Sequence, residues 1–291
     1  MPFLKHDNAT IWYRDDGSGP AILLIHGGLC DAMQGELFWD RPDIVGDLLT
    51  RGYRVLVPDR RLCGGSTKTT FAAYSWEIDA IDMASVVQAA GLERVHVVAG
   101  SNGCSTAIRL ALAYPAMVRS LILCWPTVPD NDDLRTAYEL AASTVERLGP
   151  ALYLKQLHEE SESRAVDRQM LSPWDVTLLR DDALVASFSS FEAHAAAAIM
   201  RSSSEAILAG DLLRGVWTDE VGALTRARMP ITIIPADPEN PFHPLATAMN
   251  VAAHIHGARM VRAFPESPTP RFAPLRAEFS AVLSGALKEA E

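Results

Sequence analysis

The chain has 291 residues, of which 48% are hydrophobic and 21% are charged. This composition is typical of a globular protein with a buried core, and the length suits one large α/β domain that carries an inserted subdomain. The formal net charge of −10 argues against nucleic acid or an anionic membrane surface as a partner.

The start of the chain, Met1 to Asp7, lacks the charged-then-apolar pattern of a secretory signal, and no apolar run approaches the roughly 18 residues that span a membrane. We therefore expect a cytoplasmic protein with no membrane partner. The four cysteines lack metal-ligand spacing, and no phosphate loop or dinucleotide fingerprint is present. The expected partner is a small-molecule substrate, with no cofactor and no metal; a homodimer is left open.

Apolar strands alternate with helices in chain order through the first 126 residues. Strands are predicted at residues 11–14, 21–25, 53–57, 95–98 and 118–124, with helices at 43–49, 75–90 and 105–112 between them. The alternation resumes with strands at 231–234 and 259–264 and helices at 245–254 and 275–287. Continuous apolar strands separated by helices predict a mostly parallel sheet covered by helices on both faces.

Residues 127–228 interrupt this alternation. The stretch is rich in Ala, Leu, Glu and Ser and contains no clear buried strand, so we expect a helical insertion after the strand at 118–124. The predicted domains are therefore a core of residues 1–126 and 229–291 and a helical cap of residues 127–228. Aromatic side chains such as Trp125 and Phe188 are candidates to line an apolar pocket under such a cap.

The sequence Ala99-Gly100-Ser101-Asn102-Gly103 lies between a predicted strand and a predicted helix. Small residues two places either side of a serine allow a sharp turn that presents its Oγ away from the backbone. The backbone N–H of the next residue, Asn102, would then point toward the oxygen of an attacked carbonyl group. This context predicts that Ser101 is a nucleophile.

Several such motifs occur in order, and together they resemble the α/β-hydrolase fold superfamily with a helical cap. They are the loop at His26-Gly27-Gly28, the loop from Asp59 to Ser66, the turn at Ser101, and Tyr114-Pro115 before the next strand. The resemblance implies that the backbone N–H of Gly28 or Leu29 forms an oxyanion hole with that of Asn102. It also implies an acid after the strand at 231–234, where Glu239 is the first candidate and Asp237 the second.

The resemblance also implies a catalytic histidine soon after the last strand, but no histidine occurs from Gly257 to the C-terminus. Glu266, Ser267 and Thr269 lie in that region instead, and a threonine hydroxyl cannot act as a base near neutral pH. Three explanations stay open. The base is His243, four residues beyond Glu239; or it is a histidine of the insertion, His194 or His158; or the reaction needs no histidine.

The first functional hypothesis is a serine hydrolase acting on an ester, thioester or lactone of a small to medium apolar substrate, with an atypical triad of Ser101, His243 and Glu239. A second hypothesis is a cofactor-free, non-hydrolytic enzyme, such as a cyclase, lyase or isomerase, that uses the same pocket. A third is a ligand-binding protein without catalysis. One scaffold supports many chemistries, so the fold alone does not decide among the three.

Overall fold

An eight-stranded sheet in the order β1-β2-β4-β3-β5-β6-β7-β8 organises the computed structural model. The structure describes residues 3–6, 9–28, 34–61, 63–67, 75–127, 132–162, 175, 178–179, 182–198, 200–201, 224–225, 229–238, 240, 243–267, 269 and 271–290. The strands are β1 (Phe3–His6), β2 (Ala9–Gly17), β3 (Ala21–Ile25), β4 (Arg54–Pro58), β5 (Val95–Gly100), β6 (Val118–Cys124), β7 (Ile231–Ile234) and β8 (Arg259–Met260).

Parallel pairing joins six strands in the order β4, β3, β5, β6, β7 and β8. At the other edge of the sheet, β1 pairs with β2, and β2 with β4, in antiparallel register. The predicted mostly parallel sheet is therefore confirmed. The last strand is shorter than the predicted 259–264. An isolated parallel bridge between Ala236 and Phe264 nevertheless pairs the segments that follow β7 and β8. Parallel pairing brings the carboxyl ends of these strands to one edge of the sheet.

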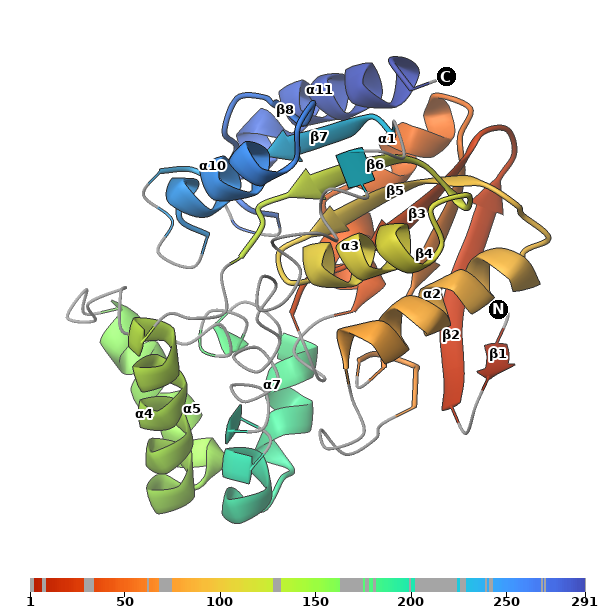
Figure 1. Cartoon of the computed structure of the whole chain (residues 1–291). Helices are drawn as coiled ribbons and strands as arrows, with labels where there is room; N and C mark the ends of the chain where they lie inside the picture. The colour runs from red at the N-terminus through yellow and green to blue at the C-terminus, as the bar shows by residue number, and fades with distance from the viewer. Residues whose placement is uncertain are drawn as a thin grey trace. The chain divides into compact units, whose positions relative to one another are not determined.

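Helices cover the two faces of this sheet (Figure 1). They are α1 (Ile44–Thr50), α2 (Trp76–Ala89), α3 (Gly103–Ala113), α10 (Leu245–His254) and α11 (Arg276–Lys288), together with a short π-helix at Glu36–Asp40 and a 3₁₀ turn at Ala273–Leu275. Leu23 and Ile25 point into one apolar cluster, and Ile22 and Leu24 into the other. This alternation is why β3 is apolar at every position.

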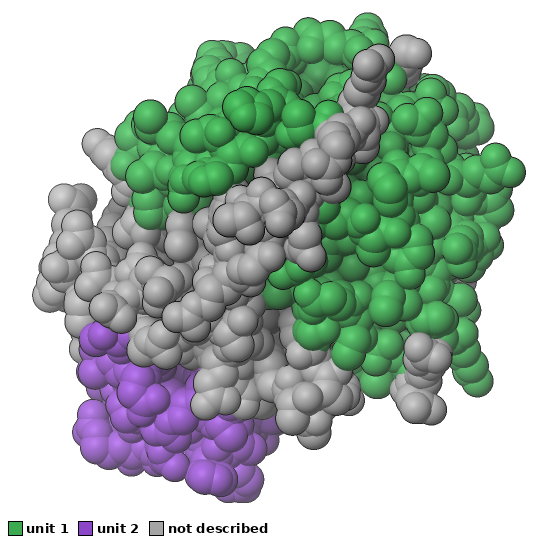
Figure 2. Space-filling model, viewed as in Figure 1, with its two compact units in different colours: residues 1–28, 33–128, 212–291 green, residues 29–32, 129–211 purple. Residues whose placement is uncertain are grey.

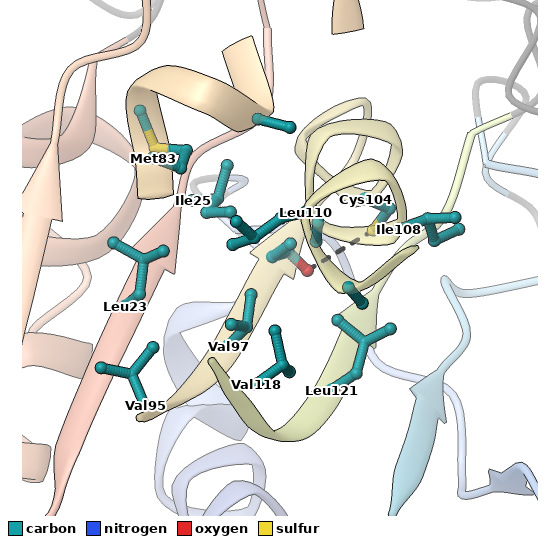
Figure 3. Packing of buried hydrophobic residues seen from close by; sticks show 14 of the residues in the cluster. Leu23, Ile25, Met83, Val95, Val97, Cys104, Ile108, Leu110, Val118 and Leu121 are labelled. Carbon is teal, nitrogen blue, oxygen red and sulfur yellow. Dashed lines mark hydrogen bonds between the residues drawn. The ribbon is translucent and has the colours of Figure 1, made fainter. Parts of the chain in front are cut away.

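The first cluster packs α2, α3 and α10 against the sheet, and the second packs α1 and α11. Figure 3 shows the first cluster around α3, where Cys104, Ile108 and Leu110 lie against side chains of the neighbouring strands, Val97 among them. Trp125, a candidate pocket residue from the sequence, is instead a core residue. It is fully buried in the second cluster, and its ring stacks on Phe279 at 5.2 Å between centroids.

The chain divides into two compact units (Figure 2). The first comprises Met1–Gly28, Met33–Val128 and Leu212–Glu291, and the second Leu29–Ala32 and Pro129–Asp211. The second unit contains α4 (Asp132–Leu148), α5 (Pro150–Glu162) and α7 (Asp182–Ser189). The role of residues 127–228 as a cap stays a prediction. Within the described ranges, no helix combines the length and the apolar character needed to cross a membrane.

His96 in β5 makes the folded state sensitive to acid. Its ring is fully buried, and burial, reinforced by the charges of Arg119 and Arg94, lowers its pKa from 6.5 to about 4. The unfolded chain therefore binds a proton between pH 6.5 and pH 4 that the folded protein does not bind, so stability falls as the pH falls through that window.

We expect the free energy of unfolding to lose about 2 kcal/mol from His96 between pH 7 and pH 5. Urea unfolding at both pH values measures this loss. In His96→Gln the pH dependence should shrink by that amount, whereas His254→Gln, which changes an exposed histidine, should leave it unchanged. Equal pH dependence in the wild type and His96→Gln would contradict the assignment.

Candidate active site

Ser101 lies in the turn that joins β5 directly to α3. Its backbone φ of 53° is in the left-handed region, which costs a residue other than glycine about 1–3 kcal/mol. Two hydrogen bonds hold the turn: the Ser101 N–H donates to the Cys124 carbonyl at 2.9 Å, and the Cys104 N–H donates to the Ser101 carbonyl at 3.0 Å. The sharp turn predicted from the small flanking residues is present.

The neighbours of this turn must be small because the backbone approaches them closely. A Cβ atom added to Gly103 would lie 2.5 Å from the His26 carbonyl oxygen, and one added to Gly27 would lie 2.5 Å from the Cβ of Ser101. Both distances are shorter than van der Waals contact. The two glycines therefore let the loop after β3 pack directly against the turn at Ser101.

His243 lies between β7 and α10, and its ring contacts the serine. The distance from His243 Nε2 to Ser101 Oγ is 2.8 Å, and both residues are at least nine-tenths buried. The backbone N–H of His243 donates to Asn240 Oδ1 at 3.2 Å, and this bond anchors the loop that carries the ring. The structure thus brings the histidine proposed as the relocated base to hydrogen-bond distance of Ser101.

Glu266 lies on the other side of the imidazole ring. Its Oε2 is 3.2 Å from His243 Nδ1, an ion-pair distance, although the ring N–H is not aligned with this oxygen as in a hydrogen bond. Misaligned contacts of this kind commonly tighten when substrate binds. The Asn240 amide approaches the same carboxylate oxygen at 3.5 Å, and the Thr269 N–H donates to the Glu266 carbonyl at 2.9 Å.

The sequence prediction did not include Glu266 as the acid. Glu239 and Leu29, the predicted acid and one predicted oxyanion donor, lie outside the described residues. Asp237, the second candidate acid, is paired instead with Arg271 at 2.6 Å. His194, an alternative base, has an 85% exposed side chain that contacts Glu146 at 3.0 Å.

A signal for Glu266 was present in the sequence. It is the carboxylate that follows the last strand, where a histidine was expected. Two backbone hydrogen bonds, from Asp237 to the Phe264 carbonyl at 3.1 Å and from Phe264 to the Pro235 carbonyl at 3.0 Å, bind the two segments together. Once the base is placed after β7, the neighbouring segment that follows Phe264 is therefore the natural place for its acid.

Two of the predicted oxyanion donors, Asn102 and Gly28, lie in segments next to the serine. Asn102 is the residue immediately before α3 and is 97% buried. A backbone N–H at this position has no acceptor within the helix, and the helix dipole adds partial positive charge there. Gly28 follows β3, whose register places Ile25 beside Ala99. The geometry therefore leaves Asn102 and Gly28 as donor candidates on adjacent strand ends.

Cys104 is a further group with nucleophilic chemistry near the turn. Its thiol is fully buried and 3.5 Å from the Ala99 carbonyl oxygen (Figure 3). Burial raises the pKa of this thiol far above its usual value, so the reactive thiolate does not form at neutral pH. In the parts of the chain that the structure covers, no group of three His, Cys, Asp or Glu side chains is arranged to hold a metal ion.

A family model described as the alpha/beta hydrolase fold matches residues 20–162. The solved structure of MGS-M2, an alpha/beta hydrolase enzyme from a Medee basin deep-sea metagenome library, aligns over 99% of this chain and 97% of its own with a TM-score of 0.71 and 16% identity. The chain belongs to the α/β-hydrolase fold superfamily. The family resemblance found in the sequence is confirmed.

Curated relatives match shorter segments of this α/β-hydrolase. A fluoroacetate dehalogenase from Burkholderia sp is 38% identical over 109 residues, which are 36% of this chain and 34% of that protein. A putative carbamate hydrolase, RutD, from Azorhizobium caulinodans is 32% identical over 155 residues, 53% of this chain and 56% of that protein. The chain thus spans about a third to about a half of the curated relatives it matches.

We expect Gly103→Ala to destabilise the α/β-hydrolase core by about 1–3 kcal/mol, because the new methyl group would collide with the backbone at His26. Urea unfolding at pH 7 measures the change. The matched control is Gly285→Ala in α11, where a Cβ would meet nothing within 4 Å and should stabilise the helix by about 0.5–1 kcal/mol. Equal stability of the two variants would contradict the close-packing argument.

Proposed function

We propose that this α/β-hydrolase is a serine hydrolase of esters, thioesters or lactones, with Ser101 as nucleophile, His243 as general base and Glu266 as the orienting acid. The observation that carries the proposal is the 2.8 Å contact between Ser101 Oγ and His243 Nε2. A nucleophile and a base at hydrogen-bond distance, with a carboxylate 3.2 Å from the far nitrogen of the base, fit the pattern of an activated serine.

Each group has a defined part in the reaction. With the ring proton on Nδ1, facing Glu266, the Nε2 lone pair accepts the proton of Ser101 as its Oγ attacks the acyl carbon. The Glu266 carboxylate stabilises the resulting imidazolium, which then protonates the departing alkoxide or thiolate. Water, activated in the same way by His243, releases the acid from the acyl-enzyme and restores the serine.

The oxyanion of each tetrahedral intermediate would accept hydrogen bonds from the backbone N–H of Asn102 and that of Gly28 or Leu29. Loss of one such donor typically costs about 3–4 kcal/mol of transition-state stabilisation. This arrangement also explains the strained turn, since it is the left-handed conformation of Ser101 that presents Oγ beside these amides. The strain is thus tied to the proposed chemistry.

The order of the proposed triad differs from the order that the family resemblance implies. The base follows β7 and the acid follows the last strand, so the chain order is serine, histidine, acid and not serine, acid, histidine. Triads are defined by geometry and role, and not by sequence order. The non-hydrolytic and ligand-binding alternatives arose because the usual histidine is missing, and the Ser101–His243 contact removes that reason for preferring them.

The relatives support a hydrolase without identifying its substrate. Their names include a dehalogenase, a carbamate hydrolase and a 2-hydroxy-6-oxo-6-phenylhexa-2,4-dienoate hydrolase, which differ in the bond that is broken. The proposed preference for small to medium apolar substrates rests on the aromatic residues of the predicted cap. The proposals of no cofactor and a cytoplasmic location rest on sequence patterns, and that of no nucleic-acid partner rests on the net charge of −10.

We expect a fluorophosphonate probe to label the wild-type protein once, at Ser101, and to leave Ser101→Ala unlabelled. His243→Ala should slow labelling by at least about 10³-fold because the serine loses its base. Intact-mass spectrometry over time measures both rates. The control is His194→Ala, whose exposed side chain should not affect labelling; a wild type that stays unlabelled at neutral pH would contradict the proposed activated nucleophile.

The identity of the acid is tested separately. Glu266→Gln should reduce kcat for p-nitrophenyl acetate by about 10³–10⁴-fold, because the imidazole loses the carboxylate that orients it and stabilises its cation. Glu239→Gln and Asp237→Asn serve as matched charge-neutralising controls and should retain activity. A larger loss in Glu239→Gln than in Glu266→Gln would return the acid to the loop after β7.

A further inference from the structure

Two consecutive arginines, Arg60 and Arg61, follow β4 and are buried against α2. The Arg60 side chain is fully buried, and its Nε donates to Asp79 Oδ2 at 2.6 Å. Thr106 of α3 donates to the same carboxylate oxygen at 2.6 Å. Burial of a charged pair is costly unless further hydrogen bonds satisfy it, so the rest of the Arg60 guanidinium needs acceptors as well.

Arg60 Nη1 finds its acceptors in the two segments that carry the proposed oxyanion donors. Arg60 Nη1 lies 3.1 Å from the carbonyl oxygens of both His26 and Gly28, and 2.9 Å from Asn102 Oδ1. One nitrogen with two hydrogens is thus shared among three acceptors. The Arg60 backbone adds a further contact, since its N–H donates to His26 Nε2 at 3.0 Å.

We propose that Arg60 is a positioning residue that holds the oxyanion-binding amides in place, an inference that rests on the proposed serine hydrolase. A peptide unit is planar, so the hydrogen bonds to the carbonyl groups of His26 and Gly28 fix the two peptide units on either side of the one that carries the Gly28 N–H. The bond to Asn102 Oδ1 fixes the other donor residue. Arg60 therefore sets the spacing between two donors that come from different loops.

The shape of the guanidinium suits this task. Arg60 uses Nε for the carboxylate on α2 and Nη1 for the acceptors at the site, and the centroid of the Trp76 ring lies 5.3 Å from the guanidinium carbon. The fork is planar and rigid, so its two sides keep a constant separation. A lysine ammonium, which is a compact point charge on a flexible stem, cannot satisfy both sides at once.

The chain supplies a matched control in the next residue. Arg61 also pairs with α2, and both its Nε and its Nη2 donate to Asp82, whose carboxylate is fully buried. Loss of either ion pair should lower stability by a similar mechanism. The two arginines differ in that Arg60 also contacts the proposed oxyanion donors, so a comparison of the two separates positioning from stability.

The test compares Arg60→Lys with Arg61→Lys in the full-length protein. We expect Arg60→Lys to lower both kcat for p-nitrophenyl acetate and the rate of fluorophosphonate labelling by about 10²-fold, since both reactions need the oxyanion donors in place. KM should change by less than about threefold. Arg61→Lys should keep both rates within about threefold of the wild type, whatever its unfolding midpoint.

Retention of the wild-type kcat in Arg60→Lys, or an equal loss in Arg61→Lys, would overturn the inference. If Arg60→Lys does not fold, the double variant Arg60→Met/Asp79→Leu removes both buried charges together and should preserve folding while showing the same 10²-fold loss in rate. Wild-type rates in this double variant would likewise overturn the inference.

Failure of the proposed function gives a different result from failure of this inference. If Ser101→Ala is still labelled and still active, the serine hydrolase proposal fails. If activity and labelling require Ser101 but Arg60→Lys reacts as fast as the wild type, the hydrolase proposal stands and Arg60 has only a structural role.

Discussion

The left-handed conformation of Ser101 is the constraint on which the rest of the site depends. A serine at φ 53° persists only when the surrounding structure compensates for its strain. Here the compensation comes from one hydrogen bond to β6 and one to α3, from glycines that let the loop after β3 approach, and from the apolar clusters that pack on both faces of the sheet. The fold and the site are therefore coupled, because loosening either would relax the turn.

Much of the fold could be predicted because its signals are local. Strands such as Ala21–Ile25 are apolar throughout because both faces of the sheet are covered. The shortening of the last strand to Arg259–Met260 was not predictable, since its exposed, partly polar residues look the same in a strand or a loop. Trp125 was misjudged for a related reason: a large aromatic residue at a domain boundary suits a pocket wall as well as a core.

The site was predicted in part. Ser101 and its small neighbours form a contiguous motif, and His243 could be proposed because it follows a strand that ends at the same edge. The contact between Glu266 and His243 joins loops that are 23 positions apart in the chain, and no local pattern encodes that pairing. It depends on how the residues after β7 and the last strand are bound together, which is a property of the folded sheet.

The proposed exchange of the imidazole and the carboxylate between neighbouring loops has a consequence for how such chains are recognised. A motif search that requires a histidine near the C-terminus would classify this protein as a pseudoenzyme, although three suitable groups converge in space. The strands β7 and β8 are adjacent and parallel, so under the proposed function the histidine and the acid each follow the strand that the other usually follows. Judging loss of catalysis in this superfamily therefore requires a distance between atoms and not a residue at a fixed position in the alignment.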